Sequence, residues 1–178
     1  MRQPERPVAT ISSIHRINGV NVDELRSYID SVEADATQAD RHPVVVGRWV
    51  GGTRAEVTSS LGGPPVYMGG DDDPSAMGML LRTLTACDIE VIVNRTALIG
   101  VQIEDLTIEA RGYFNVKRYL GLETESDPGY QWVDYTIRLQ TTPTLTADQA
   151  EMIRLACAHS PVSVTLERHV PVTLTLET

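Results

Sequence analysis

The stretch LLRTLTACDIEVIV, residues 80–93, places one cysteine in an apolar run with helical spacing. Between Met77 and Leu84 apolar side chains occupy nearly every face, which indicates a helix that is buried at the centre of the fold. A cysteine in such a helix, Cys87, is either a small core residue or a nucleophile that the fold holds in place. The functional question therefore depends on what surrounds Cys87.

Capping residues set the limits of this helix. Asp73 followed by Pro74 predicts its start, because aspartate favours the N-cap position and proline the first turn. Gly100 predicts its end. The acidic run at residues 71–73 suits the positive end of the helix dipole, so we interpret it as capping and not as a metal site. The histidines show no metal-ligand spacing and no phosphate-binding glycine loop occurs, so neither a metal nor a cofactor is expected.

The sequence predicts strands in adjacent pairs on both sides of the helix. Before it, PVVVGRWV and RAEVTSSL flank a glycine pair that is typical of a hairpin, and PVYMG predicts a third short strand. After it, apolar and polar residues alternate at 106–114, at 133–139 and again at 170–176. Adjacent strands with segregated helices predict an α+β fold with antiparallel sheet.

Helices are also expected at both ends of the chain. Thr146 and Gln149 form a capping box that opens a helix, and Pro161 breaks or restarts it. Residues 1–41 are interpreted as an N-terminal extension with one amphipathic helix, and residues 42–178 as the main domain. The helix of the extension begins after Asn21, and its apolar face, which needs a partner surface, is formed by Leu25, Tyr28, Ile29 and Val32.

Charge and composition exclude several classes of partner. The net charge is −9 and the 15 basic residues are scattered singly, which excludes nucleic acids and anionic membrane surfaces. No apolar stretch is long enough to span a bilayer. The first 13 residues contain no apolar run typical of a signal peptide, and two cysteines do not make a disulfide scaffold. We therefore expect a cytoplasmic protein.

Several segments in a fixed order resemble the OsmC and Ohr family of thiol-dependent hydroperoxide reductases. They are LL-x-x-L-x-A-C in the central helix, then RYLGLE, GYQWV and HSPVSVTLERHVPVTL, with INGVNVDEL suggesting a branch that has an N-terminal extension. The resemblance covers residues 43–177 and, less closely, the N-terminal helix. It implies an OsmC-like fold in an intertwined homodimer, in which antiparallel sheets wrap two long central helices and active sites form between subunits.

The resemblance also implies a reactive site. The cysteine that matches Cys87 attacks the peroxide oxygen as a thiolate and becomes a sulfenic acid. An arginine from the first hairpin activates it; Arg54 in GGTRAE is the best match and Arg48 is the alternative. A guanidinium within about 4–6 Å can lower the pKa of an acid by roughly 1–3 units, so Arg54 decides the reactivity of Cys87.

Two family features are altered in this chain. The resolving cysteine of a C-P-V element is replaced by Ser160, and Cys157 lies three residues earlier. A glutamate that locks the arginine is missing at the start of the helix, where Asp73 is the nearest carboxylate. If Cys157 reaches Cys87, an internal disulfide forms; otherwise an external thiol must reduce the sulfenic acid.

We therefore expect a peroxiredoxin-like enzyme of the oxidative stress response, weakened by these two losses. Its partners would be an organic hydroperoxide, a small dithiol or other thiol reductant, and a second copy of the chain. Two alternatives stay open. One is a non-catalytic dimer that binds a small hydrophobic molecule, and the other is a thiol redox sensor.

Overall fold

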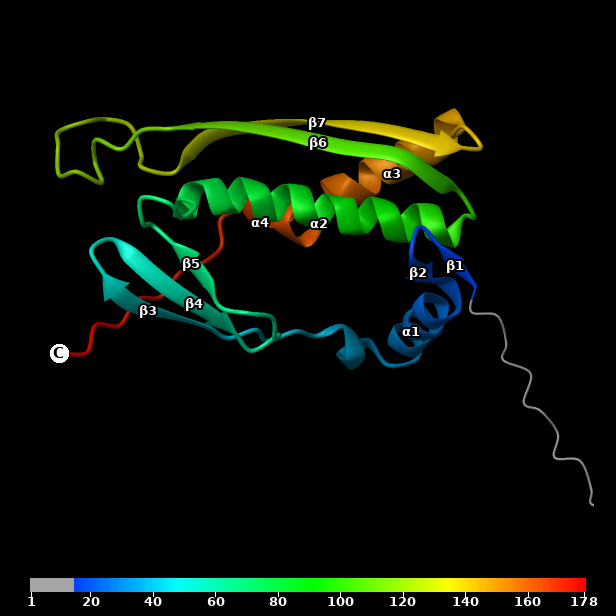
Figure 1. Ribbon diagram of the computed structural model, residues 1–178, viewed down its shortest axis with the longest axis horizontal. Coiled ribbons are helices and arrows are strands. Elements are labelled where there is room, and N and C mark those ends of the chain that lie inside the picture. The colour runs from blue at the N-terminus through cyan, green and yellow to red at the C-terminus, as the bar shows by residue number, and fades with distance from the viewer. Residues whose placement is uncertain (1–14) are drawn as a thin grey trace, which may run out of the picture.

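The computed structural model describes residues 15–178. The first 13 residues, in which we expect no signal peptide, lie outside the described residues. A long helix, α2 (Ala76–Leu98), runs along the molecule, and two long strands, β6 (Gln102–Phe114) and β7 (Tyr130–Thr142), lie along one side of it (Figure 1). The predicted α+β class with antiparallel pairing is confirmed. Within residues 15–178, no helix is long and apolar enough to cross a membrane.

Strands β6 and β7 pair antiparallel from Gln102 opposite Thr142 to Phe114 opposite Tyr130. Because side chains alternate between the two faces of a strand, one face of this ribbon is apolar and packs onto the helices. The core there consists of Ile92, Ile153 and Cys157, against which pack Leu106, Ile108, Ile137 and Leu139. The alternation in the sequence predicted these strands, and the structure confirms them.

Helix α2 begins later than predicted. Its N-cap is Ser75, whose Oγ accepts a hydrogen bond from the Gly78 N–H at 3.0 Å. The prediction that Asp73 caps the helix is wrong, because its carboxylate accepts a hydrogen bond from the side chain of Arg54. The C-terminal end is as predicted: Gly100 has a φ of +75° and its N–H donates to the carbonyl of Ala97.

Only one side of α2 is buried within a single chain. Its buried residues include a stripe at intervals of four, formed by Leu84, Asp88, Ile92 and Thr96. Positions on the other side are exposed although several are apolar, Ile89 among them. The helix is central, as expected, but its apolar residues on the second side have no covering layer among residues 15–178.

A three-stranded antiparallel sheet lies at the N-terminal end of α2 (Figure 1). Its strands are β3 (Val45–Gly51), β4 (Arg54–Ser59) and β5 (Val66–Met68), which confirms the predicted hairpin and third strand. Gly51 and Gly52 both have positive φ in the turn, a conformation that glycine adopts without steric cost. The sheet buries little of its own surface, and Trp49 is 75% exposed.

The N-terminal extension forms a short hairpin and a helix at the C-terminal end of α2. The hairpin is β1 (Arg16–Ile17) and β2 (Val20–Asn21), followed by α1 (Val22–Ala34) and the 3-10 turn η1 (Ala36–Ala39). The predicted amphipathic helix is confirmed, with Asn21 as N-cap accepting from the Glu24 N–H.

Asn18 fastens this extension to the domain. Its Nδ2 donates to Thr96 Oγ1 at 3.0 Å and to the Val101 carbonyl at 2.9 Å, and its Oδ1 accepts from the Ile103 N–H at 2.9 Å. One turn residue thus satisfies groups of both α2 and β6. Its φ of +53° is a left-handed conformation that asparagine tolerates better than most residues.

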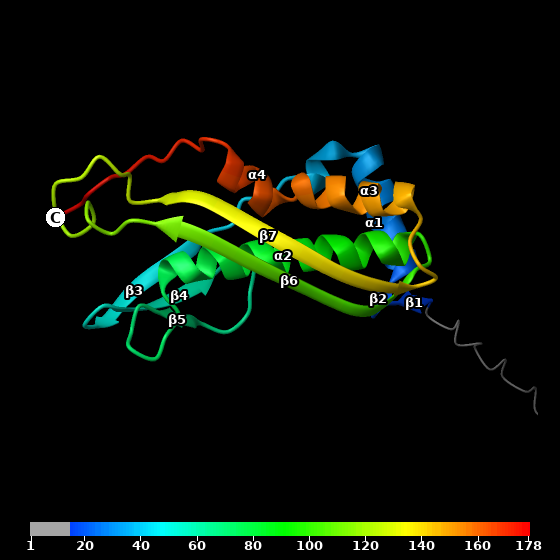
Figure 2. The ribbon, with the colours of Figure 1, turned by 90° about the horizontal axis from the view of Figure 1, so that it is seen from above.

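Two helices complete the described chain, α3 (Ala147–Ala158) and α4 (Pro161–Glu167). The capping box of Thr146 and Gln149 is present as predicted. The predicted strand at residues 170–176 does not form, because this segment pairs with no strand among residues 15–178 and its backbone hydrogen bonds are therefore not shared in a sheet. The segment extends from α4 toward the end of the molecule where β3–β5 lie (Figure 2), and Val172 and Leu174 are each 87% exposed.

Candidate functional site

Cys87 lies in the middle of α2 as a half-buried free thiol. It sits one position before Asp88, which belongs to the buried stripe of the helix, so Cys87 occupies the edge between the buried and exposed sides. Partial exposure distinguishes it from a sealed core residue. The four positions 87, 91, 94 and 98 share one side of α2, because residues three and four apart are neighbours on a helix.

The residue next to Cys87 is a fully buried carboxylate. Asp88 Oδ1 accepts a hydrogen bond from the Ser160 hydroxyl at 2.6 Å, and the Ser163 hydroxyl lies 2.9 Å from that of Ser160. Asp88 Oδ2 has no hydrogen-bond partner among residues 15–178. Ser160, which the sequence resemblance places at a resolving position, is therefore engaged in a buried polar cluster and also caps α4.

Tyr135 of β7 completes this cluster. Its hydroxyl lies 3.5 Å from Ser163 Oγ. Burial raises the pKa of the Tyr135 phenol, and the charge of Asp88 contributes to the rise. The phenol therefore keeps its proton at neutral pH and remains a hydrogen-bond donor close to the carboxylate.

Cys157 lies in the core, next to a hollow of about 400 Å³ that it lines together with Tyr135 and Arg154. It is 2% exposed and packs with Ile92 and Ile153. Burial raises the pKa of the Cys157 thiol to about 11, and the charges of Asp88 and Cys87 add to the rise. Because the thiolate is the nucleophile, Cys157 is unreactive at neutral pH in this arrangement.

Arg54 is held at the N-terminal end of α2. Its Nε donates to Asp73 Oδ2 at 2.6 Å, and its guanidinium lies over the Tyr67 ring, 4.3 Å from the centroid. The Tyr67 hydroxyl donates to Glu56 Oε2 at 2.7 Å. The bond to Asp73 raises the pKa of Arg54, so the guanidinium stays charged. Asp73, expected above only as the carboxylate nearest to the missing glutamate, thus forms an ion pair with Arg54.

Arg54 and Cys87 are not brought together within one chain. Asp73, to which Arg54 is bonded, precedes the first residue of α2, and Cys87 lies about 16 Å along the axis from that end. Arg48, the alternative, lies opposite Glu56 in the β3–β4 pair and is exposed. The two predicted arginines are thus on the hairpin and the predicted cysteine is at mid-helix.

Sequence reasoning missed Asp88, and it did not predict the partner of Asp73. Asp88 could have been found from the sequence, because it is a charged residue at a helical position between the apolar Leu84 and Ile92. Asp73 was noticed as the nearest carboxylate, but nothing local in the sequence indicates that it pairs with Arg54 of a separate strand.

A cleft of about 660 Å³ borders the Cys87 side of α2. Helices α1, α2 and α3 form its walls, and Ser160 with Pro161 closes one end. The α2 wall contains Val91, Asn94 and Leu98, which lie on the same side of the helix as Cys87. The N-terminal extension thus covers part of a cleft that leads toward the cysteine.

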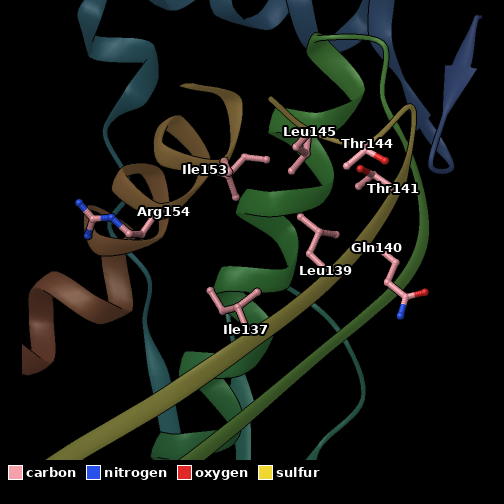
Figure 3. A pocket seen from close by; sticks show the side chains of 9 residues that line it. Ile137, Leu139, Gln140, Thr141, Thr144, Leu145, Ile153 and Arg154 are labelled. Carbon is pink, nitrogen blue, oxygen red and sulfur yellow. The ribbon is translucent and has the colours of Figure 1, made fainter. Parts of the chain in front are cut away.

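A second hollow, of about 560 Å³, lies between β7 and α3 (Figure 3). Its walls are aliphatic, with Ile137, Leu139 and Leu145 among them, while Arg154 points away from it and is bonded to Glu151. None of the predicted site residues lines this hollow. In residues 15–178, no three His, Cys, Asp or Glu side chains gather at a place that could hold a metal ion.

Comparison with known proteins gives one family. The family described as OsmC-like protein matches residues 69–175, which is more than half of the chain. A comparison with curated protein sequences gives no significant match.

Solved structures share the fold at low sequence identity. An OsmC-like protein from Mycoplasma pneumoniae is 14% identical, with a TM-score of 0.59, and the match covers 72% of this chain and 89% of that one. An OsmC-like protein of unknown function from Vibrio cholerae is 12% identical, with a TM-score of 0.56 and coverage of 72% and 95%. Fold and family match agree: the chain belongs to the OsmC-like protein family.

Proposed function

We propose that this chain is a thiol-dependent peroxidase that reduces organic hydroperoxides at Cys87. The observation that carries the proposal is the position of Cys87, a half-buried free thiol in the central helix of an OsmC-like fold, beside the wall of a cleft. Such a thiol is accessible to a small substrate, whereas Cys157 is only 2% exposed.

The active unit is a homodimer. The chain has an accessible surface of 14021 Å², against about 8,600 Å² for a compact monomer of its mass. Residues 1–14 can contribute at most about 2,200 Å² to this area. The remaining excess, the exposed side of α2 and the bare β3–β5 sheet support burial against a second copy.

A dimer also explains how Arg54 can act on Cys87 although the two residues are far apart within one chain. Arg54 is bonded to Asp73, which precedes the first residue of α2, and that end of the helix lies about 16 Å along the axis from Cys87, whereas charges on exposed groups are screened beyond about 8–10 Å. The β3–β5 sheet of one subunit therefore reaches the Cys87 of the other. Asp73 orients the guanidinium there, which replaces the lost family glutamate.

In the reaction, the Cys87 thiolate attacks the terminal oxygen of the hydroperoxide and the O–O bond breaks. The sulfur is oxidised to a sulfenic acid, and the alkoxide leaving group takes a proton and departs as an alcohol. Arg54 stabilises the negative charge on the thiolate and then on the leaving oxygen. We assign this chemistry to the cytoplasm, where free thiols persist.

The test is the oxidation of Cys87, followed by mass spectrometry after adding about one equivalent of cumene hydroperoxide. Rapid conversion to a sulfenic acid at neutral pH, absent in Cys87→Ser, is the expected result. Asp73→Asn should slow it, because the arginine loses its orienting carboxylate. Asp72→Asn is the matched control and should react like the wild type. A Cys87 that stays reduced for hours would overturn the proposal.

A second candidate is a non-catalytic dimer that binds a small hydrophobic molecule. The cleft and the separation of Arg54 from Cys87 within one chain favour it. The same experiment distinguishes the two, because a binder leaves Cys87 reduced. A redox sensor differs from both, since its Cys87 oxidises quickly and returns slowly when thiol is added.

A further inference from the structure

We propose that the cleft between α1, α2 and α3 binds a small thiol that carries a carboxylate, and that this thiol reduces the oxidised Cys87. The inference rests on the proposed function, since it concerns the second half of the same cycle. It commits to a low-molecular-weight anionic monothiol as the occupant of the cleft.

The chain has no internal thiol for this step. Ser160, at the resolving position, donates its hydrogen bond to the buried Asp88 carboxylate. Cys157 is packed in the core between Ile92 and Ile153. Forming a disulfide from it would require exposing a residue that is 2% accessible. The electrons must therefore come from outside.

The cleft leads to the oxidised sulfur. Val91 lines its α2 wall and lies one turn beyond Cys87 on the same side of the helix, about 6 Å along the axis. At the other wall, Ser160 and Pro161 close the cleft, and Ser160 contacts the residue next to Cys87. Cys87 itself does not line the cleft, so a ligand there has its near end one helical turn from the cysteine, at Val91.

The charge in the cleft points to an anion. Arg95 and His159 are among its lining residues, and that lining contains no Asp or Glu, although the chain as a whole has a net charge of −9. Arg95 forms no ion pair among residues 15–178. The Nδ1 of His159 is engaged with the Leu155 carbonyl at 2.7 Å, so Arg95 is the group in the cleft that supplies the positive charge for an anion.

The remaining walls suit the carbon skeleton of such a thiol. Leu25 and Ile29 of α1 and Met152 and Leu155 of α3 give the cleft apolar walls. A volume of about 660 Å³ is in the range of small-molecule sites. The N-terminal helix contributes one wall, which gives this extension a role in binding.

The chemistry proceeds in two balanced steps. The thiol sulfur attacks the sulfur of the Cys87 sulfenic acid, a mixed disulfide forms, and the hydroxyl group leaves as water after taking a proton. A second thiol molecule then attacks the mixed disulfide, which releases Cys87 as a thiol and the small molecule as its symmetrical disulfide.

The first experiment compares three thiols as reductants of the sulfenic acid. Rates of mixed-disulfide formation are measured with 3-mercaptopropionate, 2-mercaptoethanol and cysteamine for the wild type, Arg95→Gln and Arg82→Gln. For each variant, the rate with the anionic thiol is divided by the rate with the neutral thiol. When these ratios are compared between variants, the intrinsic reactivities of the thiols cancel. We expect the anionic-to-neutral ratio to fall about fivefold in Arg95→Gln, as for the loss of one exposed ion pair. Arg82, an exposed residue of the same helix outside the cleft, is the matched control.

A second experiment needs no peroxide. Reduced protein is treated with the anionic disulfide 5,5′-dithiobis(2-nitrobenzoate) and with neutral 2,2′-dithiodipyridine, and labelling of Cys87 is followed in the same variants. An anionic preference that Arg95→Gln removes supports the binding site even if the sulfenic acid never forms, in which case the proposed function and the reduction step fail. If the ratio of anionic to neutral labelling rates is the same in the wild type and in Arg95→Gln, the inference is overturned. The same result is expected if a second copy covers the cleft, and it overturns the inference in that case too.

Discussion

At the scale of single residues, the neighbour of Cys87 is the least expected feature. A carboxylate in the core is stable only when its oxygens find donors, because burial removes the water that would solvate its charge. Ser160 provides one such donor at 2.6 Å, and Oδ2 has none among residues 15–178. The serine at the resolving position is therefore paired with an aspartate in the helix, and the two act as a unit.

Ser160→Ala should destabilise the protein by about 1–3 kcal/mol, because it leaves both oxygens of a buried carboxylate without a partner. Asp88→Leu with Ser160→Ala should cost less than the sum of the single changes, since no unpaired charge remains. Urea unfolding at one protein concentration measures all three variants. Strict additivity of the two changes would show that the pair is not coupled.

Cys157 gives a pH-dependent prediction. Its pKa is raised to about 11 in the folded protein, above the ordinary value of 9.0, so the folded state binds more protons than the unfolded state between these values. Stability should therefore fall as the pH rises from about 9 to 11, and this fall should be smaller in Cys157→Ala. Thermal unfolding across that range is the measurement. An identical pH dependence in the two proteins would contradict the assignment.

At the scale of elements, the attachment of the extension depends on one turn. Three hydrogen bonds from Asn18 join the β1–β2 hairpin to the end of α2 and the start of β6. Helix α1 has few other polar ties to the domain, such as the Arg26 bond to the Leu98 carbonyl. The position of α1, which forms one wall of the cleft, is thus fixed mainly by the hydrogen bonds of Asn18, just before its N-terminal end.

Asn18→Ala should loosen this wall. It removes three hydrogen bonds and places a side chain without polar groups in a left-handed conformation, for a loss of roughly 1–3 kcal/mol. Hydrogen exchange should become faster in α1, while the amides in the middle of β6 keep their protection. Asn18→Gly is the control that retains the backbone conformation but not the bonds. Unchanged exchange in α1 would mean that its apolar contacts suffice.

At the scale of the whole molecule, the single chain is incomplete as a globular unit. One side of α2, the β3–β5 sheet and the C-terminal segment all present apolar side chains to solvent, including Trp49, Val172 and Leu174. Surfaces of this kind are typical of chains that bury them in an oligomer. The alternation at residues 170–176 retains the pattern of a strand, and in the proposed dimer a second copy would satisfy its backbone groups.

Light scattering coupled to size exclusion should therefore give twice the chain mass of 19.6 kDa. Replacing Val172 and Leu174 with aspartate should weaken the dimer, because two charges would enter an apolar interface. The matched control is Thr173→Asp, at the intervening position, which alternation places on the other face of a strand. A monomer in the wild type would remove the basis for Arg54 acting on Cys87 across subunits.

Local patterns in the sequence determined most elements of this protein: the helix around Cys87, the hairpin at Gly51, the two long strands and the capping box at Thr146. These depend on side-chain period and on capping within a few residues. The tertiary structure alone decided that Asp73 holds Arg54, 19 residues away, and that Ser160 bonds Asp88, 72 residues away. It also decided that residues 170–176 stay unpaired in one chain. Such contacts depend on the path of the chain through space, which no short-range pattern specifies.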